Sequence, residues 1–120
     1  MKKTKKTKKS GISLESIESG YLYFTQSGQY RAILAIQGEF LIYAPSSEGM
    51  PMLDIKSTEL PFENSPFKKC QQVTFAQKEY QAFVFDNKLD VRHRLNQSEL
   101  DQVIQQCNAV AAIKDLVNAN

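Results

Sequence analysis

Several residue types are scarce in this 120-residue sequence, and their scarcity excludes whole classes of protein. There is no tryptophan, one histidine and two cysteines. Zinc sites take three or four ligands from His, Cys, Asp and Glu, commonly in close pairs, so a metal centre is not expected. No uninterrupted apolar run is longer than that of residues 32–36, which is far below the ~20 residues that span a bilayer. Gly20, Gly28 and Gly38 lie at predicted strand starts or turns, so none forms a phosphate-binding loop ahead of a helix.

No group of residues has the pattern of a catalytic site. His93 stands between two arginines and alternates with apolar residues, as a residue on the inner edge of a strand would. Cys70 and Cys107 are far apart in the sequence and have no metal-binding spacing. We therefore predict a protein that is not an enzyme and that takes no cofactor and no metal.

The length corresponds to one domain, and 42% hydrophobic residues exclude wholesale disorder. Six of the 15 basic residues fall within residues 2–9, so the rest of the chain carries nine basic and 13 acidic residues, a net charge of −4. Like charges repel, and nothing in this segment can be buried. Residues 1–11 are therefore predicted to form a disordered Lys-rich arm, and residues 12–120 a single α+β domain.

The lysine-rich start does not continue as a secretory signal. Residues 12–18 are amphipathic, whereas a signal needs an apolar stretch of 7–15 residues at this point. We expect a cytoplasmic protein whose cysteines stay reduced. Cys107 falls on the apolar side of a predicted helix and is expected in the core. Lys68 and Lys69 precede Cys70 and would lower the pKa of its thiol if that side chain were exposed.

Apolar and aromatic runs predict an antiparallel sheet. The first three strands are joined by a Ser27-Gly28 turn and a two-residue Gly38-Glu39 loop, and connections this short require an antiparallel meander. All four prolines lie between residues 45 and 66, where any strand must be short or at an edge. Strands are expected at residues 21–25, 30–36, 40–43, 52–56, 72–76, 80–85 and 90–95.

The last element is predicted as one helix over residues 98–117. Ser98 begins a Ser-x-x-Asp pattern, in which the hydroxyl caps the first turn and the acid suits the positive end of the helix dipole. Apolar residues from Leu100 to Ala111 recur at three- and four-residue spacing, which makes one side of the helix apolar. The predicted fold class is α+β: a strongly bent antiparallel sheet or partly open barrel of six to seven strands, capped by one C-terminal helix.

This order of elements, together with several short strings, resembles the pleckstrin-homology (PH-like) fold over residues 19–117. Gly20-Tyr21-Leu22 is similar to the Gly-aromatic-Leu opening of the family's first strand, and residues 30–34, 40–43 and 80–85 resemble later strands. The resemblance implies an adaptor module. The final helix lacks the family's usual tryptophan. The family's phosphoinositide-binding members carry basic residues in the first two strands, and of these this sequence has only Arg31. An inositol-phosphate site is therefore not expected.

The lysine arm is the main functional signal. Its charges would contact phosphates and release counterions, which gives salt-sensitive binding without sequence choice. The same charges would attract an anionic membrane surface, and a merely solubilising tail is the third interpretation. Arg92 and Arg94, with Lys68 and Lys69 near them, would add a basic patch on the domain. The predicted polyanion-binding residues are Lys2, Lys3, Lys5, Lys6, Lys8, Lys9, Arg92 and Arg94.

A long proline-containing loop, residues 57–67, is the second signal, because loops of this length in small domains are often functional. It either presents Leu60, Phe62 or Phe67 to a protein partner or folds its rings back as a lid over the open end of the sheet.

Together these features indicate a non-catalytic accessory or inhibitory protein of a nucleic-acid-handling complex, whose arm grips polyanion and whose folded face binds a protein. The alternative is a PH-like adaptor that binds a protein or an anionic membrane surface in a signalling or membrane-associated assembly.

Overall fold

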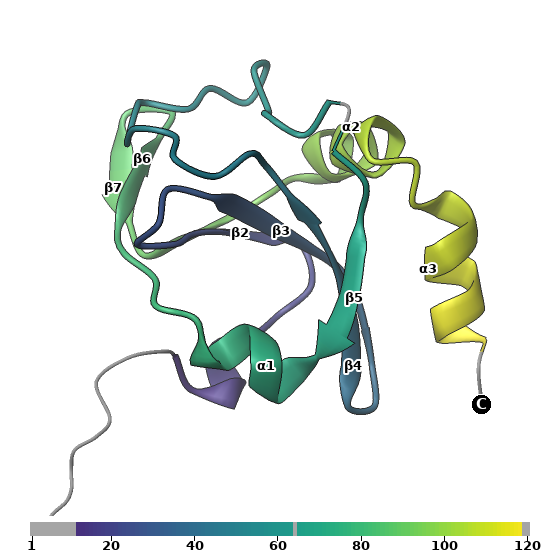
Figure 1. Cartoon of the computed structure of the whole chain (residues 1–120). Coiled ribbons are helices and arrows are strands. Elements are labelled where there is room, and N and C mark those ends of the chain that lie inside the picture. The colour runs from purple at the N-terminus through teal and green to yellow at the C-terminus, as the bar shows by residue number, and fades with distance from the viewer. Residues whose placement is uncertain (1–11, 64, 119–120) are drawn as a thin grey trace, which may run out of the picture.

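Five strands form the main sheet, in the order β5-β4-β3-β2-β8. Strands β2, β3, β4 and β5 are labelled in Figure 1. This computed structural model describes residues 12–63 and 65–118. Every pairing in the sheet is antiparallel, and the sheet does not close into a barrel. The predicted α+β class is therefore confirmed. The strands are β2 (Tyr21–Phe24), β3 (Tyr30–Gln37), β4 (Phe40–Pro45), β5 (Lys68–Gln71) and β8 (Arg92–Arg94), with a separate hairpin of β6 (Phe83–Phe85) and β7 (Lys88–Asp90).

The central meander follows the prediction because its turns are encoded locally. Gln37 pairs with Phe40 across the two-residue loop, and Gly38 has the positive φ of +61° that such a loop requires. Gly28, in the preceding turn, has φ +86°, and a Cβ added there would lie 2.6 Å from the carbonyl oxygen of Met50. Glycine is therefore needed at position 28 both for its conformation and for the close approach of residue 50.

The sheet buries side chains on both faces. One face carries Leu22, Phe24 and Ile42 into the larger apolar cluster, which the β6-β7 hairpin and the C-terminal helices complete. The other face carries Tyr23 and Tyr43 into a smaller cluster. Successive residues of a strand point to opposite faces, so strands flanked by apolar layers show nearly continuous burial, as β2 to β4 do.

The predicted single C-terminal helix is wrong, because two helices are present: α2 (Gln97–Gln106) and α3 (Val110–Val117). Asn108 lies between them with φ +58°, a left-handed conformation that ends a helix and that asparagine tolerates. The N-cap is Asn96 and not Ser98. Its side chain accepts from the Glu99 N–H at 2.8 Å, while the Glu99 carboxylate accepts from the Asn96 N–H at 2.8 Å. Cys107 is buried, as predicted.

The strand predicted at 72–76 is also wrong, because this segment forms helix α1 (Gln72–Gln77). Val, Thr and Phe favour strands locally, but tertiary packing overrides that preference. The helical turn buries Phe75, whose ring lies 5.5 Å from that of Tyr23 and 5.3 Å from that of Tyr43, and leaves Val73 exposed. Figure 1 shows α1 beside the N-terminal 3-10 turn, η1 (Leu14–Ser16), at one end of the sheet.

Three further strand predictions need smaller corrections. The strand expected at 52–56 is reduced to one isolated bridge between Ile55 and Phe85, as the neighbouring prolines lead one to expect. The region 80–85 contributes β6 at its end, and 90–95 contributes β8, preceded by β7. Strand β5 occupies residues for which no strand was predicted.

Candidate partner-binding surface

Strand β5 forms one edge of the sheet, and in the described part of the chain no strand pairs with its outer side. The Gln72 N–H donates to the Glu39 carbonyl at 2.7 Å, and the register then places Cys70 and Lys68 in the other hydrogen-bonded pairs with β4. Bonded and non-bonded pairs alternate in an antiparallel ladder. The main-chain groups of Lys69 and the N–H of Gln71 therefore point away from β4.

This edge carries positive charge. The side chains of Lys68 and Lys69 are exposed, and no carboxylate of the described residues lies within ion-pair distance of either ammonium group. The Lys69 Nζ lies 5.2 Å from the ring centre of Phe40, a cation–π contact with a ring that is itself 41% exposed. Lysines on an edge strand oppose pairing with another copy of the same edge.

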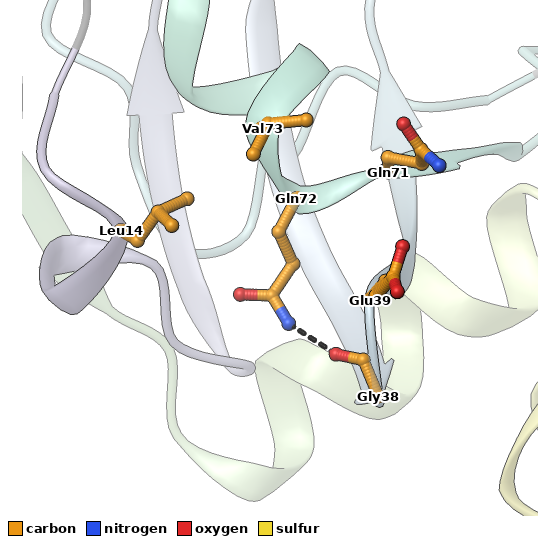
Figure 2. A pocket seen from close by; sticks show the side chains of 6 residues that line it. All are labelled: Leu14, Gly38, Glu39, Gln71, Gln72 and Val73. Atoms are coloured by element: carbon orange, nitrogen blue, oxygen red, sulfur yellow. Dashed lines mark hydrogen bonds between the residues drawn. The ribbon is translucent and has the colours of Figure 1, made fainter.

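A hollow of about 260 Å³ adjoins the end of β5 (Figure 2). The Gln72 side chain crosses it and donates from Nε2 to the Gly38 carbonyl at 2.6 Å. Leu14 from η1 and Val73 from α1 are 49% and 46% exposed, so apolar surface borders the opening. The hollow is smaller than the roughly 300–1,000 Å³ of typical small-molecule sites and would hold one or two side chains. Its lining residues are Leu14, Gly38, Glu39, Gln71, Gln72 and Val73.

We call residues 68–71 together with this hollow the β5 surface. It combines unpaired main-chain groups, two unpaired ammonium groups and an apolar recess. Such a combination can bind another polypeptide by adding a strand to the sheet.

The cation Arg31 packs against the smaller cluster and forms no ion pair with an acidic side chain among the described residues. The Arg31 guanidinium carbon lies 4.8 Å from the ring centre of Tyr43, and its nitrogens donate to Gln29 Oε1 at 2.6 Å and to the Tyr80 hydroxyl at 3.3 Å. Burial raises the pKa of the Cys70 thiol, and the opposing effect of Arg31 is smaller. Cys70 is therefore a protonated, half-buried thiol, and the neighbouring lysines do not activate it.

The predicted basic patch does not form. Arg92 and Arg94 lie on β8, at the opposite edge of the sheet from Lys68 and Lys69. Arg92 is engaged within the fold: it donates to the Ser16 carbonyl at 2.8 Å and to Glu18 Oε1 at 2.9 Å, and its guanidinium carbon lies 4.1 Å from the ring centre of Tyr21. Of the two arginines, Arg94 is exposed and Arg92 is partly buried.

The described residues of the 57–67 loop, which exclude residue 64, fold back onto the sheet. Phe62 is fully buried and Leu60 is 4% exposed, both within the larger cluster, and the Phe62 N–H donates to Gln106 Oε1 at 3.3 Å. Phe67 is partly buried against the same cluster. In this structure Leu60 and Phe62 are core residues, which corresponds to the lid alternative, because burying them completes the apolar layer. Neither offers a side chain to a partner.

Residues 1–11, with Lys2, Lys3, Lys5, Lys6, Lys8 and Lys9, lie outside the described residues. His93 lies on the inner side of its strand, as predicted, with its ring 4.9 Å from that of Phe83 and 5.3 Å from that of Phe85. Its Nε2 is buried, and no atom in the described part of the chain forms a hydrogen bond with it.

Sequence reasoning missed β5, although a signal for it exists. Lys68-Lys69 directly follows the proline-containing loop, and lysines are typical of edge strands. The strand is four residues long and has no buried side chain, so it lacks the apolar alternation by which strands are recognised.

Comparison of the chain with protein-family models, with curated proteins and with solved structures finds no match. Within residues 12–63 and 65–118, no cluster of three or more His, Cys, Asp or Glu side chains is arranged to hold a metal ion. In the same part of the chain, no helix has the length and apolar character needed to cross a membrane.

Proposed function

We propose that the protein is a non-catalytic accessory or inhibitory binding protein that acts on a nucleic-acid-handling complex. The lysine-rich arm, residues 1–11, binds nucleic acid or another polyanion, and the folded domain binds a protein partner. The observation that carries the proposal is the β5 surface, an exposed sheet edge with unpaired lysines beside an apolar hollow.

The distribution of charge assigns different roles to the arm and to the folded domain. Six lysines within residues 2–9 supply a strong but unselective attraction, because phosphate contacts carry no sequence information. The remaining chain has a net charge of −4 and would not form a broad nucleic-acid platform. Choice of partner therefore falls to the folded face, where a sheet edge and a side-chain-sized recess supply shape and register.

A salt titration tests the arm. Binding to single-stranded and duplex DNA and RNA is measured for the full chain and for a variant with all six arm lysines changed to glutamine, which keeps the length. If all six contact phosphates of duplex DNA, log K falls with log salt with a slope of about −5, a loss of about a thousandfold between 50 and 200 mM salt. The variant should lose this binding.

The same pair of proteins tests the competing adaptor function. Vesicles of neutral lipid with one third anionic lipid replace the nucleic acid. Binding to these vesicles but to no nucleic acid would favour an adaptor at a membrane, to which each lysine near the surface contributes about 1 kcal/mol. Absence of any arm-dependent binding at low salt would leave the arm a solubilising tail and would refute the polyanion half of the proposal.

A further inference from the structure

We infer that the outer edge of β5 binds an extended acidic segment of a protein partner by strand addition, with an apolar side chain of that segment in the adjoining hollow. The inference rests on the proposed function, since it names the class of partner segment that the folded face would bind. It goes beyond that proposal in naming the atoms that bind and the chemistry that they select.

The main chain of β5 supplies the attachment points. The ladder with β4 uses the main-chain groups of Lys68 and Cys70, which leaves the N–H and C=O of Lys69 and the N–H of Gln71 directed outward. The Gln71 carbonyl belongs to the first turn of α1, because Gln71 is the N-cap of that helix. An added strand thus finds two donors and one acceptor, and its pairing ends where α1 begins.

Charge decides which kind of strand fits. Lys68 and Lys69 point to opposite faces of the sheet, so adjacent acidic residues on an added strand would meet one ammonium group each. A second copy of the chain would bring lysines against lysines, and the arm of the same chain is itself lysine-rich. Both are electrostatically unsuited to this edge, whereas an acidic segment is complementary to it.

The hollow adds a requirement at the end of the segment. Leu14 and Val73 border it with apolar surface, and Glu39 stands at its rim. A carboxylate there would be repelled, whereas an aliphatic side chain would be removed from water. The segment that fits best therefore has adjacent acids opposite Lys68 and Lys69 and an aliphatic residue beyond them.

The opposite edge is a poorer site for the same kind of ligand. Strand β8 has three residues, and the charge of Arg92 is already paired with Glu18. The Leu95 N–H donates to the Gly20 carbonyl, so the next hydrogen-bonded pair of the β2-β8 ladder is His93 with Leu22. The main-chain groups of Arg92 and Arg94 therefore point outward. Arg94 therefore offers a matched control position: it lies on a free edge with an outward N–H but at the other side of the sheet.

The probe is the acetylated and amidated peptide Val-Thr-Glu-Glu-Thr-Val, in which either strand direction places a valine opposite Gln71, beside the hollow. Two control peptides carry lysine in place of both acids, or N-methyl groups on alternate residues. The proteins are the full chain, Lys69→Pro and Arg94→Pro. Proline at either position removes an outward N–H of an edge strand without removing a ladder hydrogen bond, a setting in which strands tolerate proline.

Amide resonances and amide hydrogen exchange report binding. In the native chain the acidic peptide should shift and protect the amides of Lys69 and Gln71, and the lysine peptide should bind at least about tenfold more weakly. Lys69→Pro should weaken the acidic peptide by about tenfold or more, while Arg94→Pro leaves it within about twofold. If Lys69→Pro does not fold, loss of binding by the N-methyl peptide gives the same information.

Three results would overturn the inference: no change at Lys69 and Gln71 with the acidic peptide, equal binding of the lysine peptide, or unchanged binding by Lys69→Pro. Concentration-dependent dimerisation that Lys69→Pro abolishes, without peptide binding, would also overturn it and would assign the edge to a second copy. The proposed function is measured separately: salt-sensitive binding by the arm can persist when the peptide fails, and then only the strand-addition site is lost.

Discussion

Replacing Phe62 by alanine tests whether the 57–67 loop is part of the core. The ring is fully buried in the larger cluster, so the substitution removes its transfer free energy and leaves a cavity. Changes of this kind cost about 3–5 kcal/mol. At about 0.05–0.15 kcal/mol per residue the whole chain is stable by roughly 6–18 kcal/mol, so one ring accounts for a large share. With an unfolding entropy near 2.1 cal/mol/K per residue, the loss lowers Tm by about 12–20 °C.

The assay is thermal and urea unfolding followed by circular dichroism, with Phe40→Ala as the matched control. Phe40 is the same residue type at 41% exposure, and its loss should cost no more than about 1 kcal/mol. If Phe62→Ala melts within about 3 °C of the native chain, the ring does not hold the loop to the core. Unchanged stability combined with lost partner binding would identify Phe62 as a partner anchor.

Three further changes have expected outcomes. Gly28→Ala should lower the free energy of unfolding by about 2–4 kcal/mol in urea titrations, because the added Cβ would meet the Met50 carbonyl at a positive φ; a neutral effect would contradict this turn geometry. Asn108→Val should destabilise by about 1–2 kcal/mol and Asn108→Gly by far less, and equal effects would show that α2 and α3 are not separated by a left-handed residue. Burial raises the pKa of four tyrosines above the ordinary value of 10.0, so their neutral form stabilises the fold. This stability is fully present below about pH 10 and is lost as the pH rises beyond it. Urea unfolding at about pH 9 and about pH 11 checks this, and equal free energies of unfolding at the two pH values would contradict it. These tyrosines are Tyr23, Tyr30, Tyr43 and Tyr80.

The parts of the fold that sequence reasoning predicted are those with local causes. The β2-β3-β4 meander follows from apolar runs and from turns whose glycines need a positive φ. The sequence 72–77 is the opposite case: its strand-forming residues become helix α1 because one helical turn places Phe75 between Tyr23 and Tyr43, tyrosines from distant strands. The break at Asn108 was missed because apolar spacing continues through it, although asparagine is a residue that tolerates the left-handed conformation.

The candidate surface was less accessible to prediction than the fold. The sequence identifies Lys68 and Lys69 as basic residues. Their position at an edge depends on which strands pair, and pairing between segments distant in sequence is not encoded locally. The expectation that they lie near Arg92 and Arg94 failed for this reason, since the two pairs occupy opposite edges. Likewise, the loop sequence alone allowed Leu60 and Phe62 to be exposed anchors or buried residues, and only the packing of the larger cluster separates these possibilities.

The pairing of β2 with β8 has a consequence for how the protein is made. Strands β2, β3 and β4 are contiguous and can pair as soon as they leave the ribosome, but the second neighbour of β2 is encoded far downstream of β4. Until that segment emerges, one side of an apolar strand stays without hydrogen-bonding partners, and such edges pair readily with other chains. Synthesis interrupted before Arg92 would therefore leave a sheet that has its hairpins but lacks the arginine-bearing strand that shields β2 from aggregation.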